Sequence, residues 1–332
     1  MSRLILTFGD SVAAGLREAT HPDCVVPFTL RFVWGQLRST KETDSLLATR
    51  STNHEVDADH WPDTLGTRFE EVRQKGLSLA EFCDRFDTVE LWADPEPNTQ
   101  LQLVWLLDRL RSHSDVTSRL ALAQMDISLV EYLTEEVAGR QRPVVPIHND
   151  HLEIANAAWA AWRAPTPVAW FDLLAQDLSA LPQLRNTVIA LLEELPMRGT
   201  GLGATEMRIL QLLAVGRTHP YDLFPGHEKP NERRTYGYWE VGELLDGLAR
   251  CPLPAISGLA EGPFDDALHD DKDRHDRYRQ SKLSLTELGK AILAQSDDFC
   301  RRNPIRRWWG GTELTNDRLW RWDSENRRLV AP

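Results

Sequence analysis

Gly9, Asp10 and Ser11 form the first group in the chain whose types and spacing could carry chemistry. They follow an apolar run, Arg3–Phe8, and precede a segment of good helix formers, Val12–Ala19. A chain that passes from a strand through a glycine into a helix presents unpaired backbone N–H groups and the positive end of the helix dipole above the turn. We therefore expect these three residues to bind a small anionic ligand. The simpler interpretation is a glycine needed for the turn and Asp10 or Ser11 as a helix cap.

A second polar group, Asp94, Asn98 and Gln100, follows the strand predicted over Thr88–Ala93. In open parallel sheets, ligands lie beyond the carboxyl ends of the strands. These side chains are therefore expected to line the same pocket, opposite Gly9–Ser11. The alternative is that Asp94 turns the chain and that Asn98, or the neighbouring threonine, caps the helix that follows.

The Gly-Asp-Ser sequence also resembles the first block of GDS-type esterases and lipases, in which Ser11 would be the nucleophile. Such an enzyme needs an asparagine block to complete the oxyanion hole and an Asp-x-x-His to activate the serine. The stretch 148–150 supplies an asparagine without the expected glycine. Asp266–His269 and Asp57–His60 both fit the last block, the first within the predicted C-terminal domain and the second too early. A Ser11-dependent esterase stays the alternative function.

Three clusters of histidine and acidic residues raise the question of a metal: 54–60, 148–151 and 269–275. None has the His-Glu-x-x-His spacing that places two ligands on one helix face. All three lie in polar stretches of loop-like composition, so the sequence favours solvated histidines and predicts no metal site.

The elements that must position these residues alternate between strand and helix. Strands are predicted over 3–8, 24–28, 88–93 and 120–125, the last three after polar or helical segments. Strands alternating with helices indicate a largely parallel, Rossmann-like sheet covered on both faces. Within this region, Ser78–Glu81 has the pattern of a capping box, and Thr40–Asp63 is polar enough to be a long loop or insertion.

The 332 residues allow two domains, and the composition is typical of soluble proteins. The four cysteines are far apart and no apolar stretch approaches the ~20 residues that span a bilayer, so we expect a cytoplasmic protein with reduced thiols and no membrane contact. Residues 1–199 hold 18 Lys+Arg and 29 Asp+Glu, a net charge of −11, and residues 200–332 hold 20 and 21, a net charge of −1. An acidic first part opposes binding to nucleic acid.

We predict an α/β domain over 1–147, a helical connector over 148–199 and a third region over 200–332. Helices at 204–213, 221–224 and 236–250, a strand near 252–256 and a strand leading into a helix at 283–293 resemble a winged helix-turn-helix. The charged run 265–276 is expected to extend the wing as a solvated loop.

Acidic residues on the helix 236–250 have the wrong sign for phosphate contact, which favours a protein-docking role for the winged helix. The C-terminal tail interleaves arginine with tryptophan and offers two interpretations. In the first, the tryptophans and arginines stack on the bases of nucleic acid and the arginines bind its phosphates. In the second, the tail is a flap anchored by its tryptophans, and its arginines pair with the acidic N-terminal domain. The charge balance favours the flap. Its residues are Arg301, Arg302, Arg306, Arg307, Trp308, Trp309, Arg318, Trp320, Arg321, Trp322, Arg327 and Arg328.

Several segments together resemble the bacterial family catalogued as domain of unknown function 1835. They are Phe8–Ser11, Val25–Phe28, Glu90–Trp92, Gln100–Leu103, Leu106–Asp108, Ala157–Ala161, Ser179–Pro182, Thr205–Glu206, Ile209–Leu210, Trp308–Gly311 and Trp320–Asp323. The resemblance implies an α/β domain, helices and a C-terminal winged-helix-like region, and it implies no reaction or cofactor. Where the family carries an aromatic, acidic and His-Asp stretch, this chain has Ala93–Pro97, so that histidine is missing here.

Together, these patterns predict a small-ligand-binding α/β domain coupled to a winged-helix regulatory or protein-docking module. Binding of nucleic acid through the tail stays a further alternative. The sequence completes no catalytic constellation and leaves the ligand and the oligomeric state open.

Overall fold

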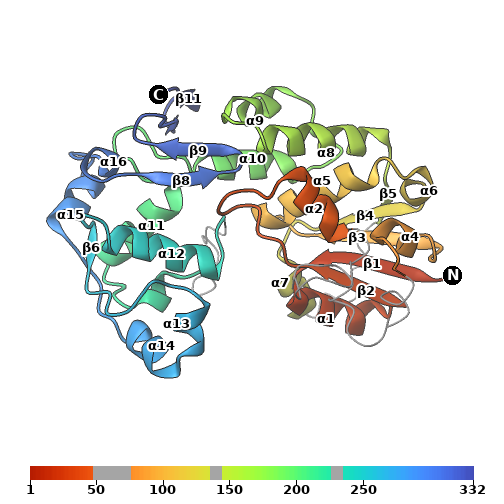
Figure 1. The fold of residues 1–332 in the computed structure, drawn as a ribbon, viewed down its shortest axis with the longest axis horizontal. Helices are drawn as coiled ribbons and strands as arrows, with labels where there is room; N and C mark the ends of the chain where they lie inside the picture. The colour runs from red at the N-terminus through yellow and green to blue at the C-terminus, as the bar shows by residue number, and fades with distance from the viewer. Residues whose placement is uncertain (48–75, 135–143, 226–234) are drawn as a thin grey trace. The chain divides into compact units, whose positions relative to one another are not determined.

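The computed structural model describes residues 1–47, 76–134, 144–225 and 235–332 (Figure 1). The predicted cluster at 54–60, with its Asp57–His60 block, lies outside these residues. The chain divides into two compact units. The first unit comprises Met1–Phe32, Gln36–Arg163 and Asp172–Thr187, and the second unit comprises Val33–Gly35, Ala164–Phe171 and Val188–Pro332. Two short stretches, Val33–Gly35 and Ala164–Phe171, are thus counted with the second unit although residues of the first unit flank them in the sequence.

A five-stranded sheet forms the centre of the first unit (Figure 1). Its strands are β1 (Arg3–Phe8), β2 (Cys24–Phe28), β3 (Thr88–Ala93), β4 (Leu120–Gln124) and β5 (Val145–Pro146). The spatial order is β2-β1-β3-β4-β5, with β5 alone antiparallel to its neighbour. The predicted α/β class with a mostly parallel sheet is confirmed, and the first three strands have the predicted bounds.

Helices cover both faces of this sheet (Figure 1). On one face, α1 (Asp10–Thr20) and α7 (Leu129–Thr134) pack against Ile5, Val25 and Trp92 in a shared apolar cluster. Strand residues that alternate with these point to the other face, where α5 (Pro97–Leu110) and α8 (Asn149–Trp162) lie. The sheet is therefore buried on both sides, as its continuous apolar strands require.

The helix α5 is buried around almost its whole circumference, because the sheet covers one side and α8 the other. Leu101, Leu103, Trp105 and Leu107 have no exposed surface. The helix begins at Pro97 with Glu96 at the N-cap, so the predicted cap at Asn98 or Thr99 is wrong. The reason is that the amide of Asn98 makes other hydrogen bonds, described below.

Shorter helices complete the first unit and the segment that follows it. They are α2 (Thr40–Leu47), α4 (Leu79–Cys83), α6 (Ser114–Thr117), α9 (Val168–Asp172), η3 (Leu173–Ala175) and α10 (Leu184–Leu192). The predicted capping box is confirmed, since Ser78 and Glu81 bond reciprocally at the start of α4. The loop predicted from residue 40 is wrong over α2, and its remainder to Asp63 lies outside the described residues.

The second unit consists of short helices and three small antiparallel strand pairs. Its helices are α11 (Ala204–Ala214), η4 (Pro220–Leu223), α12 (Tyr238–Ala249), α13 (Asp266–Asp270), α14 (Lys272–Arg279), α15 (Glu287–Leu293) and α16 (Phe299–Arg302). Its strands pair as β6 (Ile256–Ser257) with β7 (Ser284–Leu285), β8 (Arg306–Trp309) with β9 (Thr312–Thr315), and β10 (Arg321–Asp323) with β11 (Arg328–Val330).

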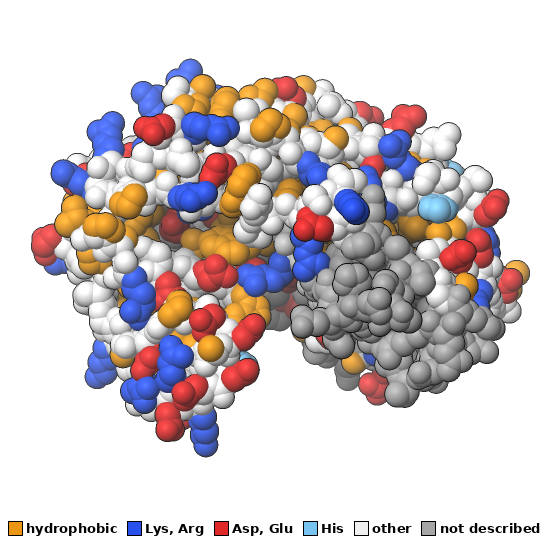
Figure 2. Space-filling model, viewed as in Figure 1, with side chains coloured by type: hydrophobic (Ala, Val, Ile, Leu, Met, Phe, Trp, Pro, Cys, Tyr) orange, Lys and Arg blue, Asp and Glu red, His pale blue; other side chains and the backbone are white. Residues whose placement is uncertain are grey.

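The charged run 265–276 is helical, so the loop predicted there is wrong. Asp265 accepts a hydrogen bond from the backbone N–H of Leu268 and caps α13. Asp271 accepts two from the first turn of α14. Figure 2 shows basic and acidic side chains interspersed over this region rather than gathered by sign. Capping by aspartate and mixed charge allow a polar stretch to form helices.

No helix in the described ranges combines the length and the apolar surface needed to cross a bilayer.

Candidate functional site

The turn between β1 and α1 leaves several backbone donors unused by the helix. Gly9 has a φ of 116°, a backbone conformation that favours glycine, and its N–H donates to the carbonyl of Phe28 at 2.9 Å. The first bond within the helix runs from the N–H of Ala13 to the carbonyl of Gly9 at 3.1 Å. The N–H groups of Asp10, Ser11 and Val12 therefore have no partner within the helix. The side chains of Asp10 and Ser11 are exposed.

This turn lies at the point where the order of the strands reverses, because β2 is added on one side of β1 and β3 on the other. The central strand β1 has β2 on one side and β3 on the other, and all three are parallel. The helix after β1 and the helix after β3 cover opposite faces. In sheets of this order, the crevice that opens between the two diverging connections is the usual place for a ligand. Gly9 and Asp94, which follow β1 and β3, both lie at this edge.

The three residues predicted on the second wall are held by internal hydrogen bonds. The carboxylate of Asp94 accepts from the backbone N–H of Glu96 at 3.1 Å and of Leu129 at 3.2 Å, and its side chain is buried. Asp94 thus turns the chain after β3 and fastens the start of α7. This is the capping and turning role given above as the alternative.

Asn98 is turned toward another segment. Its Oδ1 accepts from the N–H of Phe32 at 2.8 Å, and its Nδ2 donates to the carbonyl of Leu30 at 2.8 Å. The N–H of Leu30 also donates to Gln102. The amino-terminal part of α5 therefore holds the chain that leaves β2.

Gln100 belongs to a chain of side-chain amides at the same edge. Its Nε2 donates to the backbone carbonyl of Asp94 at 2.6 Å, and its Oε1 accepts from Nε2 of Gln124 at 2.8 Å. The Oε1 of Gln124 is buried and has no hydrogen-bond partner among the described residues. The same is true of Oγ of Ser128, a residue that is 7% exposed and precedes α7.

Gln124 and Ser128 were not singled out from the sequence. The signal that identifies them is the one that identified Asp94, because Gln124 is the last residue of the parallel strand β4 and Ser128 follows its carboxyl end. The sequence did not draw attention to Gln124, because it is the single strongly polar residue in the apolar run 120–125.

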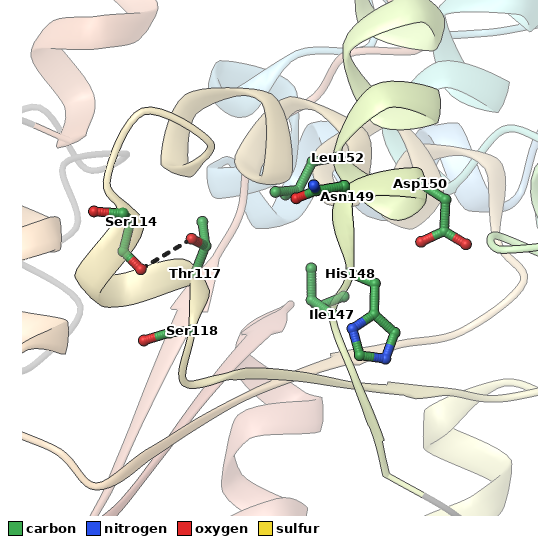
Figure 3. Close-up of a pocket in the computed structure, with 8 residues that line it drawn as sticks. All are labelled: Ser114, Thr117, Ser118, Ile147, His148, Asn149, Asp150 and Leu152. Atoms are coloured by element: carbon green, nitrogen blue, oxygen red, sulfur yellow. Dashed lines mark hydrogen bonds between the residues drawn. The ribbon is translucent and has the colours of Figure 1, made fainter.

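A measurable hollow lies at the opposite, amino-terminal edge of the sheet (Figure 3). Its volume is about 540 Å³. Serine and threonine side chains on and after α6 line one side, and the start of α8 lines the other. The residues are Ser114, Thr117, Ser118, Ile147, His148, Asn149, Asp150 and Leu152. Most are exposed, and Asp150 points away from the serines and binds His151 instead.

No activating histidine is bonded to Ser11 among the residues that the structure describes. The hydroxyl of Ser11 makes no hydrogen bond there, and His148 and His151 lie at the amino-terminal edge of the sheet, away from the turn at Gly9. Asp266 and His269 sit together on α13 in the second unit. The blocks that the esterase interpretation requires are thus placed on separate elements.

Within the described ranges, no group of three or more histidine, cysteine or acidic side chains is arranged to hold a metal ion. The four cysteines all lie in the described ranges, and none of them forms a disulfide. Burial raises the pKa of the thiols of Cys83 and Cys300 to about 12, which leaves neither as a nucleophile at neutral pH.

Five of the eight arginines of the tail pair with carboxylates of the second unit, not with the N-terminal domain as predicted. Arg307 binds Glu206 at 3.1 Å, and Arg321 binds Asp298 at 2.8 Å. The indole of Trp309 donates to the carbonyl of Leu191, and Trp309 and Trp322 are each 3% exposed. Their carboxylate partners lie between Glu206 and Asp323, which the difference in net charge between residues 1–199 and 200–332 did not reveal. Two of the four indoles, Trp309 and Trp322, are thus part of the packing of the second unit, whereas Trp308 and Trp320 keep part of their surface exposed.

No protein-family model matches this chain, and no curated protein matches it either.

Proposed function

We propose that the first unit binds a small anionic ligand above the β1–α1 turn and that the second unit docks a protein partner in response. The single observation that carries the proposal is the turn itself. Three consecutive N–H groups without helical partners follow Gly9 at the point where the sheet order reverses. Backbone donors at a helix N-terminus favour phosphate or carboxylate groups.

Coupling between the two functions is supported by the segment Leu30–Gly35. Its first residues are bonded to α5 of the first unit, as described above. Its last residues are counted with the second unit, where the indole of Trp34 donates to Glu243 on α12 at 2.6 Å. The ring of Trp34 also meets Tyr236 edge-on, with centroids 5.3 Å apart. Leu30–Gly35 is therefore one of the stretches in which the chain passes between the two units.

A protein partner for the second unit is favoured over nucleic acid by the charge of α12. Between Tyr238 and Ala249 the helix carries three acidic residues and no lysine or arginine, and Arg250 at its C-cap binds Asp246 at 3.0 Å, so the helix offers no row of basic side chains for phosphates. The winged-helix arrangement that the sequence predicts for this unit agrees with a docking module.

The test is a thermal-shift screen of nucleotides, sugar phosphates and carboxylates with two charge variants. Ser11→Glu adds a negative charge beside the unpaired N–H groups, which repels an anionic ligand and favours the helix itself. We expect it to abolish stabilisation by every anionic compound that stabilises the wild type. A ligand at about 100 times its Kd stabilises by about 2.7 kcal/mol, roughly 5–10 °C in Tm for a unit of this size.

Ala14→Glu is the matched control, because Ala14 is exposed one turn further along α1 and carries none of the unpaired donors. It should retain the shifts. A panel without any hit, or equal shifts in both variants, contradicts the proposal. Labelling of Ser11 by a fluorophosphonate probe would instead support the esterase alternative.

A further inference from the structure

Two buried polar atoms that have no hydrogen-bond partner among the described residues lie at and just after the carboxyl end of β4, near Asp94. One is Oε1 of Gln124 and the other is Oγ of Ser128. Gln124 is linked to Asp94 through Gln100, and Ser128 adjoins Leu129, whose N–H binds the Asp94 carboxylate. A buried polar atom without a partner costs free energy, which a site offsets when a ligand completes its hydrogen bonds.

The hydrogen bonds of the amide chain fix which group Gln124 offers. A backbone carbonyl only accepts, so Gln100 must turn its NH₂ group toward Asp94 and its oxygen toward Gln124. Gln124 must then turn its NH₂ group toward Gln100. Its own oxygen is left over at the end of the chain as an acceptor. A ligand group that satisfies it has to be a donor.

The distance from the turn at Gly9 sets the size of the ligand. The strands β1, β3 and β4 are neighbours, and parallel strands lie about 4.8 Å apart, so the ends of β1 and β4 are separated by about 10 Å. Inorganic phosphate is too small to reach both. A hydroxylated ring that carries a phosphate spans this distance.

We propose that Gln124 and Ser128 bind a hydroxyl or amino group of the ligand whose anionic end lies at the β1–α1 turn. The ligand class is a sugar phosphate or nucleotide. This inference rests on the proposed function, which it deepens by assigning the second half of the site.

Ser128→Ala separates this proposal from a structural role, because it removes a buried hydroxyl that has no partner in the described part of the chain. The variant should have a higher Tm than the wild type without ligand, since an unsatisfied group is lost. It should also bind adenosine monophosphate or ribose 5-phosphate about three- to tenfold more weakly, the loss expected for one hydrogen bond. Ser114→Ala, an exposed serine of the hollow at the other edge, is the matched control and should change neither.

The ligand side gives an independent measurement. The 2′,3′-dideoxy form of adenosine monophosphate should bind the wild type more weakly than the parent, and the difference should shrink in Ser128→Ala. Comparing the affinities of ribose 5-phosphate and adenosine monophosphate shows whether the sugar phosphate alone is sufficient for binding or whether the base contributes to the affinity.

Each outcome bears on one claim. If no probe stabilises the wild type, the proposed function fails and this inference with it. A second outcome is that Ser11→Glu abolishes binding while Ser128→Ala, or removal of the ligand hydroxyls, leaves the affinity unchanged. Water then satisfies Gln124 and Ser128, and only the inference fails. Weaker binding in Ser114→Ala alone places the ligand in the other hollow and overturns both.

Discussion

At the scale of single residues, the polar groups of this protein divide into those whose hydrogen bonds are complete and those left open. Asp94 and Asn98 belong to the first kind, and they hold the edge of the sheet in shape. Gln124 and Ser128 belong to the second. Residue types after a strand indicate the edge at which a ligand binds, but only the bonding pattern distinguishes scaffold from binding group.

Asp323 is a further residue whose bonds are complete, and it gives a prediction about pH. Hydrogen bonds from Asn326, with added support from Arg328 and Arg198, lower the pKa of its carboxyl to about 2. A carboxyl with a lowered pKa stabilises the fold fully above its ordinary value of 3.8, and this contribution is lost as the pH falls toward 2. We expect Asp323→Asn to be less stable than the wild type at pH 7, with a difference that narrows between pH 4 and pH 2.

Urea unfolding at pH 7, 5, 3.5 and 2.5 measures this difference. Asp317→Asn, in the exposed turn before β10, is the control and should follow the wild type at each pH. A constant difference at all pH values would mean that the ionised form of Asp323 does not stabilise the hairpin.

At the scale of elements, α14 depends on its cap because it has little apolar surface. Tyr278 is its buried residue, and Asp271 accepts hydrogen bonds from the N–H groups of Asp273 and Arg274 at 3.1 Å. We expect Asp271→Ala to lower the free energy of unfolding by about 1 kcal/mol, the usual value of such a cap. Chemical denaturation measures it, and amide exchange should show faster opening of α14.

The neighbouring Asp270 provides the control. Its side chain is 82% exposed and does not cap the helix. Asp270→Ala should therefore leave both the stability and the exchange of α14 close to those of the wild type, and equal losses in both variants would contradict the assigned role of Asp271.

The elements also show how far the sequence could be interpreted. Arg3–Phe8, Cys24–Phe28 and Thr88–Ala93 were predicted to the residue, because buried parallel strands are continuous apolar runs that end at turn residues. The helices at 266–279 were missed because caps and mixed charge, rather than an apolar face, stabilise them.

The same contrast applies to the candidate site. The turn at Gly9 could be predicted, since a glycine between strand and helix is a local pattern. The amide chain from Asp94 to Gln124 could not, because it joins β3, α5 and β4 through contacts that only the folded chain creates.

At the scale of the whole molecule, the segment Leu30–Gly35 makes the proposed coupling testable. Replacing Trp34 by alanine removes its bond to Glu243 and its contact with Tyr236. We expect Trp34→Ala to bind the strongest probe of the screen within about twofold of the wild type, since the donors at Gly9 are untouched. It should lose the ligand-induced protection of α12 in hydrogen exchange, because the link to that helix is gone.

Val215→Ala, which changes a residue that is 76% exposed in the second unit, should behave as the wild type. If α12 is protected equally with and without the indole, the signal does not pass through this segment.

The proline in β2 has a consequence for how copies of this chain meet. The carbonyl of Phe28 points toward β1, where it accepts from Gly9, so the backbone of the preceding Pro27 faces outward. A proline there has no N–H to offer a further strand, and the strand at the opposite border, β5, is two residues long. Neither edge strand of this sheet offers a full row of backbone donors and acceptors to a strand from another copy. Aggregation by addition of strands to this sheet is therefore disfavoured.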